Sequence, residues 1–233
     1  MITFHISYEA ENQYDHAVQE ALFEFLVVPC DNERQKVLRQ QSTNSADCTP
    51  FFSRNVFGYD SLCFRAFGPF RQFSFKFDCH IQVDDKHPLP DVSFCLPQEE
   101  EAQLLLSEEF QVDHYLYIQQ TPLTDIPLHL IPASMRYLKS VPLLTYATEL
   151  NSTLHKLIKY TPNVTNVHTK AIEILASPAG VCQDYSHLML GILRSQHIPA
   201  RYVSGYLNQG KQFVGSARMH AWIEVFIPAL GWV

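Results

Sequence analysis

Hydrophobic and polar residues alternate along the first third of the chain, which is the pattern of half-buried β-strands. The alternation covers residues 2–8 and, over a longer stretch, residues 73–83. Nine of the 16 phenylalanines lie between Phe51 and Phe77, so the expected core is rich in aromatic rings. Several short strands separated by turn residues predict an antiparallel β-sandwich over residues 1–95. Further strands are expected at residues 23–27 and 62–66.

In the last third of the chain, hydrophobic residues no longer alternate with polar ones but recur at the spacing of an α-helix. Apolar residues recur every three or four positions from Leu143, which predicts a helix that ends before Pro162. A helix that starts at about Cys182 has apolar residues at i, i+3, i+4, i+7 and i+8 from Tyr185. Helices followed by strands predict an α+β second domain over residues 143–233. The other expected elements are a helix at 171–176, strands at 201–207 and 218–227, and a turn at 228–231 before a return strand.

Between these parts, residues 96–142 are rich in proline and are predicted to form a connecting region. Some helix is expected over residues 102–109. The acidic triplet at residues 99–101 is interpreted as a solvated face.

Composition narrows the function classes. The chain has 233 residues, of which 46% are hydrophobic and 18% charged, with a formal net charge of −7 and no run of Lys or Arg. A nucleic-acid partner or an anionic membrane partner is therefore not expected. No apolar stretch is long enough to predict a membrane-spanning helix, and we expect no secretory signal. The six cysteines form no C-x-x-C pair, so a metal site is not expected and a reduced, cytoplasmic protein is.

Cys182 is the candidate nucleophile. It lies at the predicted start of a helix, where unpaired N–H groups and the helix dipole favour a thiolate. By position alone, a buried inert thiol is the alternative. His220 supplies the expected base, because a histidine on a strand beside Trp222 can present a ring nitrogen to a thiol across the interface. A histidine with a purely structural role is the alternative reading of His220.

Three segments of the chain resemble bacterial transglutaminase-like proteins. They are residues 180–188 (GVCQDYSHL), 198–206 (IPARYVSGY) and 220–225 (HAWIEV), and residues 160–162 (YTP) also fit the pattern. The phenylalanine-rich first third looks like the β-domain that commonly precedes this catalytic domain. The resemblance therefore covers most of the chain and is strongest in its second half.

The resemblance implies a papain-like core with a Cys-His-Asp triad in that chain order. Cys182 carries over as the nucleophile and His220 as the base, and the third member is expected beyond Val233. Glu224 is interpreted as a structural carboxylate, and Asp184 as a partner of the helix N-terminus. No metal or cofactor is implied.

Four further residues are candidate substrate contacts around the cleft, and two histidines are not assigned to it. His187 is interpreted as structural. His197 occupies a position after the helix where the family usually has glycine, so we expect a strained left-handed conformation there. The candidate substrate contacts are Gln183, Tyr202, Tyr206 and Trp222.

These observations favour a cysteine protease or amidase that cleaves peptide or isopeptide bonds in a peptide or protein substrate. Cys182 would form the acyl-enzyme and its backbone N–H would be the first oxyanion donor, while the second donor is not identified. Two alternatives stay open: a transamidase that links glutamine to amines, and a non-catalytic binding protein on the same fold.

Overall fold

The computed structural model describes residues 1–84, 91–207 and 219–233. Contacts within the chain divide it into two compact units, Met1–His87 and Pro88–Val233. The division therefore falls near residue 88, a few residues before the expected end of the β-rich part at residue 95. In the described part of the chain, we find no helix with the length and apolar character that spanning a membrane requires.

The first unit is an antiparallel sheet around one long strand, β4 (Asp60–Val83). β1 (Ile2–Phe25) pairs with β4 along nearly its whole length. β2 (Gln35–Asn44) pairs with the later part of β4, and β3 (Phe51–Arg54) pairs with its first residues. The strands predicted at residues 2–8, 62–66 and 73–83 lie within β1 and β4, whereas the one predicted at 23–27 extends past the end of β1 at Phe25. β2 and β3 were not predicted from the alternating pattern.

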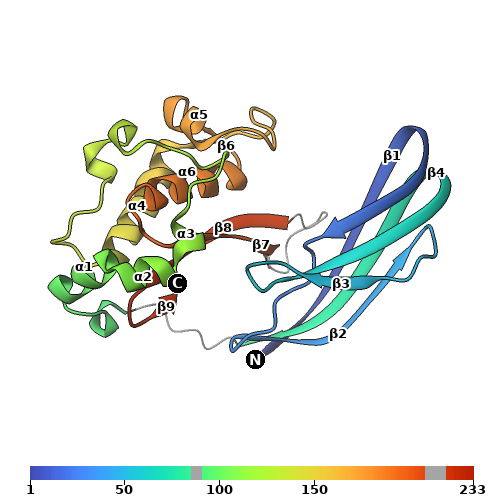
Figure 1. Cartoon of the computed structure of the whole chain (residues 1–233), viewed down its shortest axis with the longest axis horizontal. Coiled ribbons are helices and arrows are strands. Elements are labelled where there is room, and N and C mark those ends of the chain that lie inside the picture. Colours follow the sequence, from blue (N-terminus) through green and yellow to red (C-terminus); the bar gives the residue numbers. More distant parts are fainter. Residues whose placement is uncertain (85–90, 208–218) are drawn as a thin grey trace. The chain divides into compact units, whose positions relative to one another are not determined.

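Both long strands bend back, and the two halves of the sheet then face each other (Figure 1). Phe23 stacks on Phe73 with ring centroids 3.8 Å apart, and Phe64 lies 5.7 Å from Phe73. A straight strand would separate Phe64 and Phe73 by about 30 Å. Gly68, at φ +95°, and register shifts near Val18 produce the bend. The predicted sandwich is thus made by one folded sheet with a phenylalanine core.

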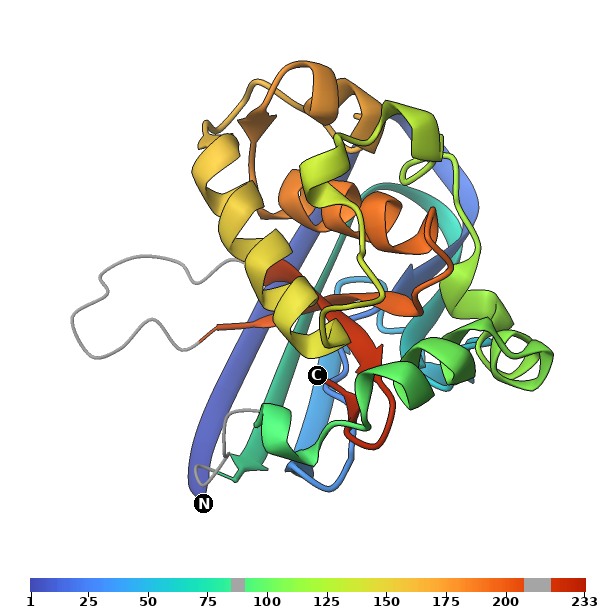
Figure 2. The same cartoon turned by 90° about the vertical axis from the view of Figure 1, so that its left-hand side faces the viewer.

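The second unit combines helices with short sheets (Figure 2). Its strands β5 and β6 form a parallel pair, and β7, β8 and β9 form an antiparallel sheet in that order. The α-helices are α1 (Gln98–Leu106), α2 (Glu108–Asp113), α3 (Tyr115–Ile118), α4 (Leu143–Leu157), α5 (Ala171–Ala176) and α6 (Cys182–Arg194). The strands are β5 (Lys159–Tyr160), β6 (Ala179–Gly180), β7 (Ala200–Tyr206), β8 (Met219–Ile227) and β9 (Gly231–Trp232). The 3-10 turns are η1 (Val92–Phe94), η2 (Leu128–Leu130) and η3 (Ala133–Met135).

Helix α6 is the central element of this unit. It packs against α4, α5, β7 and β8, and its apolar stripe is almost completely buried at Leu188, Ile192 and Leu193. The helical periodicity in the sequence therefore predicted both α6 and the face that it buries. The predicted helix at 171–176 and the strands of the β7–β8 pair are confirmed, although Arg218 lies outside the described residues.

Residues 96–142 do not form a separate connection, contrary to expectation. Phe110, Ile126 and Ile131 are buried in the same core cluster as α4 and α6. This packing could not be predicted from the sequence, because the prolines divide the segment into short helices and 3-10 turns. Such short elements have too few residues to show a hydrophobic period.

Glu101 also differs from its predicted place on a solvated face. Its side chain is fully buried, and one carboxylate oxygen accepts a hydrogen bond of 2.8 Å from the backbone N–H of Leu143. Burial raises the pKa of this carboxyl group, and the Leu143 N–H partly offsets the rise. Glu101 therefore satisfies the N-terminus of α4 from a distant part of the sequence.

The chain's last described residues form the predicted hairpin. Phe226 pairs with Trp232, and Val225 and Val233 exchange two backbone hydrogen bonds of 2.8 and 3.0 Å. Gly231 has φ +78°, the conformation that favours glycine in such a turn. The family's aspartate, which we expected beyond Val233, stays a prediction.

Candidate active site

Cys182 is the first residue of α6, and Asp184 holds this helix start in place. The backbone N–H of Val181 donates to Asp184 Oδ2 over 2.7 Å, and the Thr165 hydroxyl donates to the same oxygen over 2.7 Å. Asp184 is only 1% exposed. Its carboxylate therefore caps the helix from inside the fold, which agrees with the role expected from the sequence.

The glycine before the cysteine is required by the same carboxylate. A Cβ atom on Gly180 would lie 2.4 Å from Asp184 Oδ2, a distance that real contacts do not reach. Gly180 also pairs with Tyr160 in the parallel β5–β6 sheet. The spacing of Gly180, Cys182 and Asp184 is thus a geometric requirement of the helix start.

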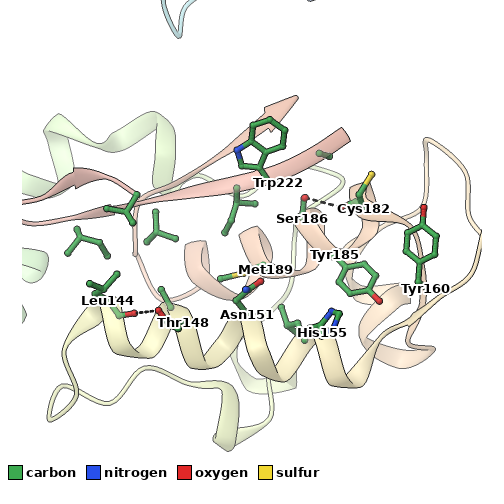
Figure 3. A pocket seen from close by; sticks show the side chains of 17 residues that line it. Leu144, Thr148, Asn151, His155, Tyr160, Cys182, Tyr185, Ser186, Met189 and Trp222 are labelled. Carbon is green, nitrogen blue, oxygen red and sulfur yellow. Dashed lines mark hydrogen bonds between the residues drawn. The ribbon is translucent and has the colours of Figure 1, made fainter. Parts of the chain in front are cut away.

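Cys182 is a free, half-buried thiol at the edge of a pocket of about 680 Å³ (Figure 3). Its carbonyl accepts a hydrogen bond of 2.9 Å from the Ser186 hydroxyl, one turn further along α6. The pocket is lined from α4 by Leu144, Ala147, Thr148, Asn151, Leu154 and His155, from β5 by Tyr160, from α6 by Cys182, Tyr185, Ser186 and Met189, from β8 by Ala221, Trp222, Ile223, Val225 and Ile227, and by Val233. None of these described lining residues is Asp, Glu, Lys or Arg, so the pocket lining itself has no permanently charged side chain.

His220 lies near the beginning of β8, next to the pocket residues Ala221 and Trp222. It pairs with Gly205 of β7, and strand alternation places it on the sheet face of Trp222. The Trp222 ring lies against Gly205, where a Cβ atom would be only 2.6 Å from the indole. The structure therefore brings Cys182 and Trp222 to one pocket, while the pairing of Cys182 with His220 stays a prediction.

Tyr202 on β7 packs against α6 beside the sheet residues of the site. Its ring centroid is 5.5 Å from that of His187 on α6, and its register partner Ile223 lines the pocket. Burial raises the pKa of the Tyr202 phenol, and the charges of Cys182 and Asp184 raise it further. Tyr202 itself is not part of the described pocket lining.

The remaining candidates have simpler surroundings. Tyr206 ends β7 opposite Met219, and Gln183 is the second residue of α6 and half-buried. Glu224 accepts a 2.6 Å hydrogen bond from Arg201, whose guanidinium also lies 4.3 Å from the ring centroid of Trp232. This ion pair supports the structural reading of Glu224.

Two histidines that were not assigned to the site behave as the sequence suggested. His187 is 8% exposed, and burial lowers its pKa, so its surroundings favour the neutral ring. His197 follows α6 with φ +59°, the left-handed conformation that glycine adopts more easily. Both findings are consistent with structural rather than chemical roles.

Sequence reasoning overlooked Tyr160 as a site residue. It appeared only as part of a family pattern, but it lines the same pocket as Cys182. Tyr160 pairs with Gly180, which precedes Cys182 by two residues. Such a pairing between distant segments leaves no periodic pattern in the sequence, so it could not be predicted. Among the residues that the structure describes, no group of three or more His, Cys, Asp or Glu side chains is arranged to hold a metal ion.

The second half of the chain is similar to a known protein family. Residues 135–233 match the family model of the transglutaminase-like superfamily. This part of the chain belongs to that superfamily. The matched segment contains α4, α6, β7 and β8, and therefore both Cys182 and His220.

Relatives of the chain include two uncharacterized mycobacterial proteins. A Mycobacterium leprae protein is 43% identical over 79 residues, which cover 32% of this chain and 28% of the relative. A Mycobacterium bovis protein is 26% identical over 237 residues, which cover 97% of this chain and 74% of the relative. The second alignment shows that similarity extends across both units.

A solved structure shares the fold. The crystal structure of "a Putative Cysteine Protease from Cytophaga hutchinsonii" matches with a TM-score of 0.62 and 17% identity, over 100% of this chain and 77% of that one. At this identity the likeness shows the fold alone.

Proposed function

We propose that this chain is a thiol enzyme that hydrolyses peptide or isopeptide amide bonds, with Cys182 as the nucleophile and His220 as the base. The observation that carries the proposal is the position of Cys182, at the first residue of α6 and on the edge of a pocket that Trp222 also lines. Helix starts of this kind favour a thiolate, and nucleophilic cysteines are partly exposed.

The proposed reaction has two steps. His220 first takes the proton of the Cys182 thiol, and the sulfur forms a bond to the amide carbon while the C=O electron pair moves to oxygen. The pair then returns, the C–N bond breaks, and the amine leaves with that proton from the His220 imidazolium. Water next attacks the thioester and gives a proton to His220, and the acid leaves as the Cys182 thiol is restored. An amine in place of water would make the reaction transamidation.

The surroundings support a peptide or protein substrate. The described pocket lining has no permanently charged side chain, so an uncharged amide would meet no opposing charge there. We also propose a reducing, cytoplasmic setting, which the six free cysteines support.

The deciding experiment replaces the nucleophile. We expect Cys182→Ala to abolish hydrolysis of a library of peptide amides and glutamine peptides, because the thioester can no longer form. His220→Ala should lose nearly as much activity, and the double variant little more, because members of a catalytic unit are not additive. Circular dichroism checks that each variant is folded.

Cys95→Ala is the matched control, since Cys95 is also half-buried in the second unit and burial raises its pKa. It should retain full activity. In the wild type, iodoacetamide at pH 6 should label Cys182 before Cys48, Cys63, Cys79 and Cys95, whose pKa values burial raises. Hydrolysis that survives Cys182→Ala would refute the proposal, and peptide binding without turnover would favour a binding protein.

A further inference from the structure

Tyr160 is held in a fixed position beside the start of α6. Its two neighbours are anchored, because the Lys159 N–H donates to the Pro178 carbonyl over 3.1 Å and the Thr161 N–H donates to the Gly180 carbonyl over 2.9 Å. These bonds join β5 to the segment that leads directly into Cys182. The backbone of Tyr160 therefore cannot shift without moving the helix start.

The Tyr160 side chain faces the same space as the sulfur. Both residues line one pocket, and Figure 3 shows the Tyr160 hydroxyl and the Cys182 sulfur directed to the same side of the helix start. Tyr160 is 60% exposed. Among the hydrogen bonds found between described residues, its hydroxyl has no acceptor. A phenol O–H at this place is available to a bound molecule.

The other tyrosines near Cys182 are less suitable. The Tyr185 hydroxyl donates to the Ile158 carbonyl, and in Figure 3 it points away from the sulfur. Tyr202 packs its ring against His187 and does not belong to the described pocket lining. Only Tyr160, of these three, combines a place in the pocket with a hydroxyl not engaged with the described chain.

Resting on the proposed function, we propose that the Tyr160 hydroxyl is the second oxyanion donor of the active site. When the Cys182 sulfur bonds to the carbonyl carbon, the C=O pair moves onto oxygen and forms an oxyanion. The backbone N–H of Cys182, at the N-terminus of α6, donates one hydrogen bond to it, and Tyr160 donates the other. No proton is transferred from Tyr160, and both donors are released when the C=O bond re-forms. Preorganised donors of this kind stabilise the transition state rather than the bound substrate.

The test uses 4-nitrophenyl acetate, whose attack by a thiolate also passes through an oxyanion and releases 4-nitrophenolate. In the whole 233-residue chain, we expect Tyr160→Phe to slow the acylation burst about 100-fold, as loss of one oxyanion donor does in other enzymes. Alkylation of Cys182 by iodoacetamide should proceed at the wild-type rate, because that displacement forms no oxyanion. The phenylalanine ring preserves the packing.

Tyr115→Phe is the matched control, since Tyr115 is 58% exposed in the same unit and outside the pocket lining. It should leave both rates unchanged. A wild-type burst rate in Tyr160→Phe would overturn the oxyanion assignment and leave the nucleophile standing. If Tyr160→Phe slowed the acylation burst and the alkylation of Cys182 equally, the assignment would also be overturned, because Tyr160 would then have a structural role. Absence of a burst in the wild type, or a burst in Cys182→Ala, would instead overturn the proposed function.

Discussion

The two units of the chain bury different kinds of side chain. The first unit has a core of phenylalanines, and its ion pairs, such as Arg54–Asp60 and Arg65–Glu20, lie on the surface. Among the described polar residues of that unit, Ser61 is the buried one. The second unit has a mainly aliphatic core but also buries charged or titratable side chains. These are Glu101, Asp184, His187 and Arg194.

Three of these four side chains, all but His187, bind at the ends of the main helices. Glu101 binds the N-terminus of α4, and Asp184 binds that of α6. Arg194, in the last turn of α6, donates two hydrogen bonds to the Ala200 carbonyl at the start of β7. Burying such groups is costly unless they are paired. In the second unit, these paired groups hold in place α6, which contains Cys182, and β7, which contains Tyr202.

The largest expected effect tests that contrast directly. Asp184→Ala should lower the free energy of unfolding by about 3 kcal/mol, because the part-buried Val181 N–H and Thr165 hydroxyl lose a buried, charged acceptor. Urea unfolding measures the change, and iodoacetamide labelling of Cys182 in the folded variant should slow as the helix start loosens.

Asp60→Ala in the first unit is the control for this variant. It removes an exposed ion pair with Arg54, which contributes little to stability. We expect no resolvable change in its urea midpoint. A loss as large as that of Asp184→Ala would show that the two units do not differ in the way described.

A smaller effect follows from the pH dependence of His187. Burial lowers its pKa in the folded protein, and Arg194 lowers it further, while Asp184 and the Thr169 carbonyl partly offset the shift. The unfolded chain therefore takes up a proton first as pH falls below about 6.5. Stability from the neutral ring is present above that pH and is lost as pH falls through the folded-state pKa.

Urea unfolding of the wild type from pH 8 to pH 5.5 should show this decrease, and His187→Gln should reduce its slope. His168→Gln, at an exposed position in the same unit, is the comparison and should keep the wild-type slope. Equal slopes for the wild type and His187→Gln would contradict the assignment.

The smallest expected effect has the opposite sign. His197→Gly should raise the free energy of unfolding by about 1 kcal/mol, because glycine adopts φ +59° without the cost that a side chain imposes. Glu149→Gly, at an exposed position inside α4, should lower it by about 1 kcal/mol. If both changes destabilise the protein, His197 contributes contacts that outweigh its backbone strain.

The sequence by itself determined the elements whose pattern is local. Alternation predicted most of the two long strands β1 and β4 but not β2 or β3, helical spacing predicted α4, α5 and α6, and turn residues predicted the final hairpin. It also singled out Cys182 at a helix start and the unusual backbone at His197. Each of these features depends on residues within a few positions of one another, so it can be predicted from the sequence alone.

Tertiary structure decided what depends on distant residues. The folding of one sheet into a sandwich rests on Phe23 meeting Phe73, and the burial of Glu101 rests on the N-terminus of α4, 42 positions away. The proline-rich segment joined the second core because it buries Phe110, Ile126, Ile131 and Met135 there. Tyr160 entered the candidate site through a parallel pair with Gly180. No local period records such pairings, because they form only when separate elements pack together.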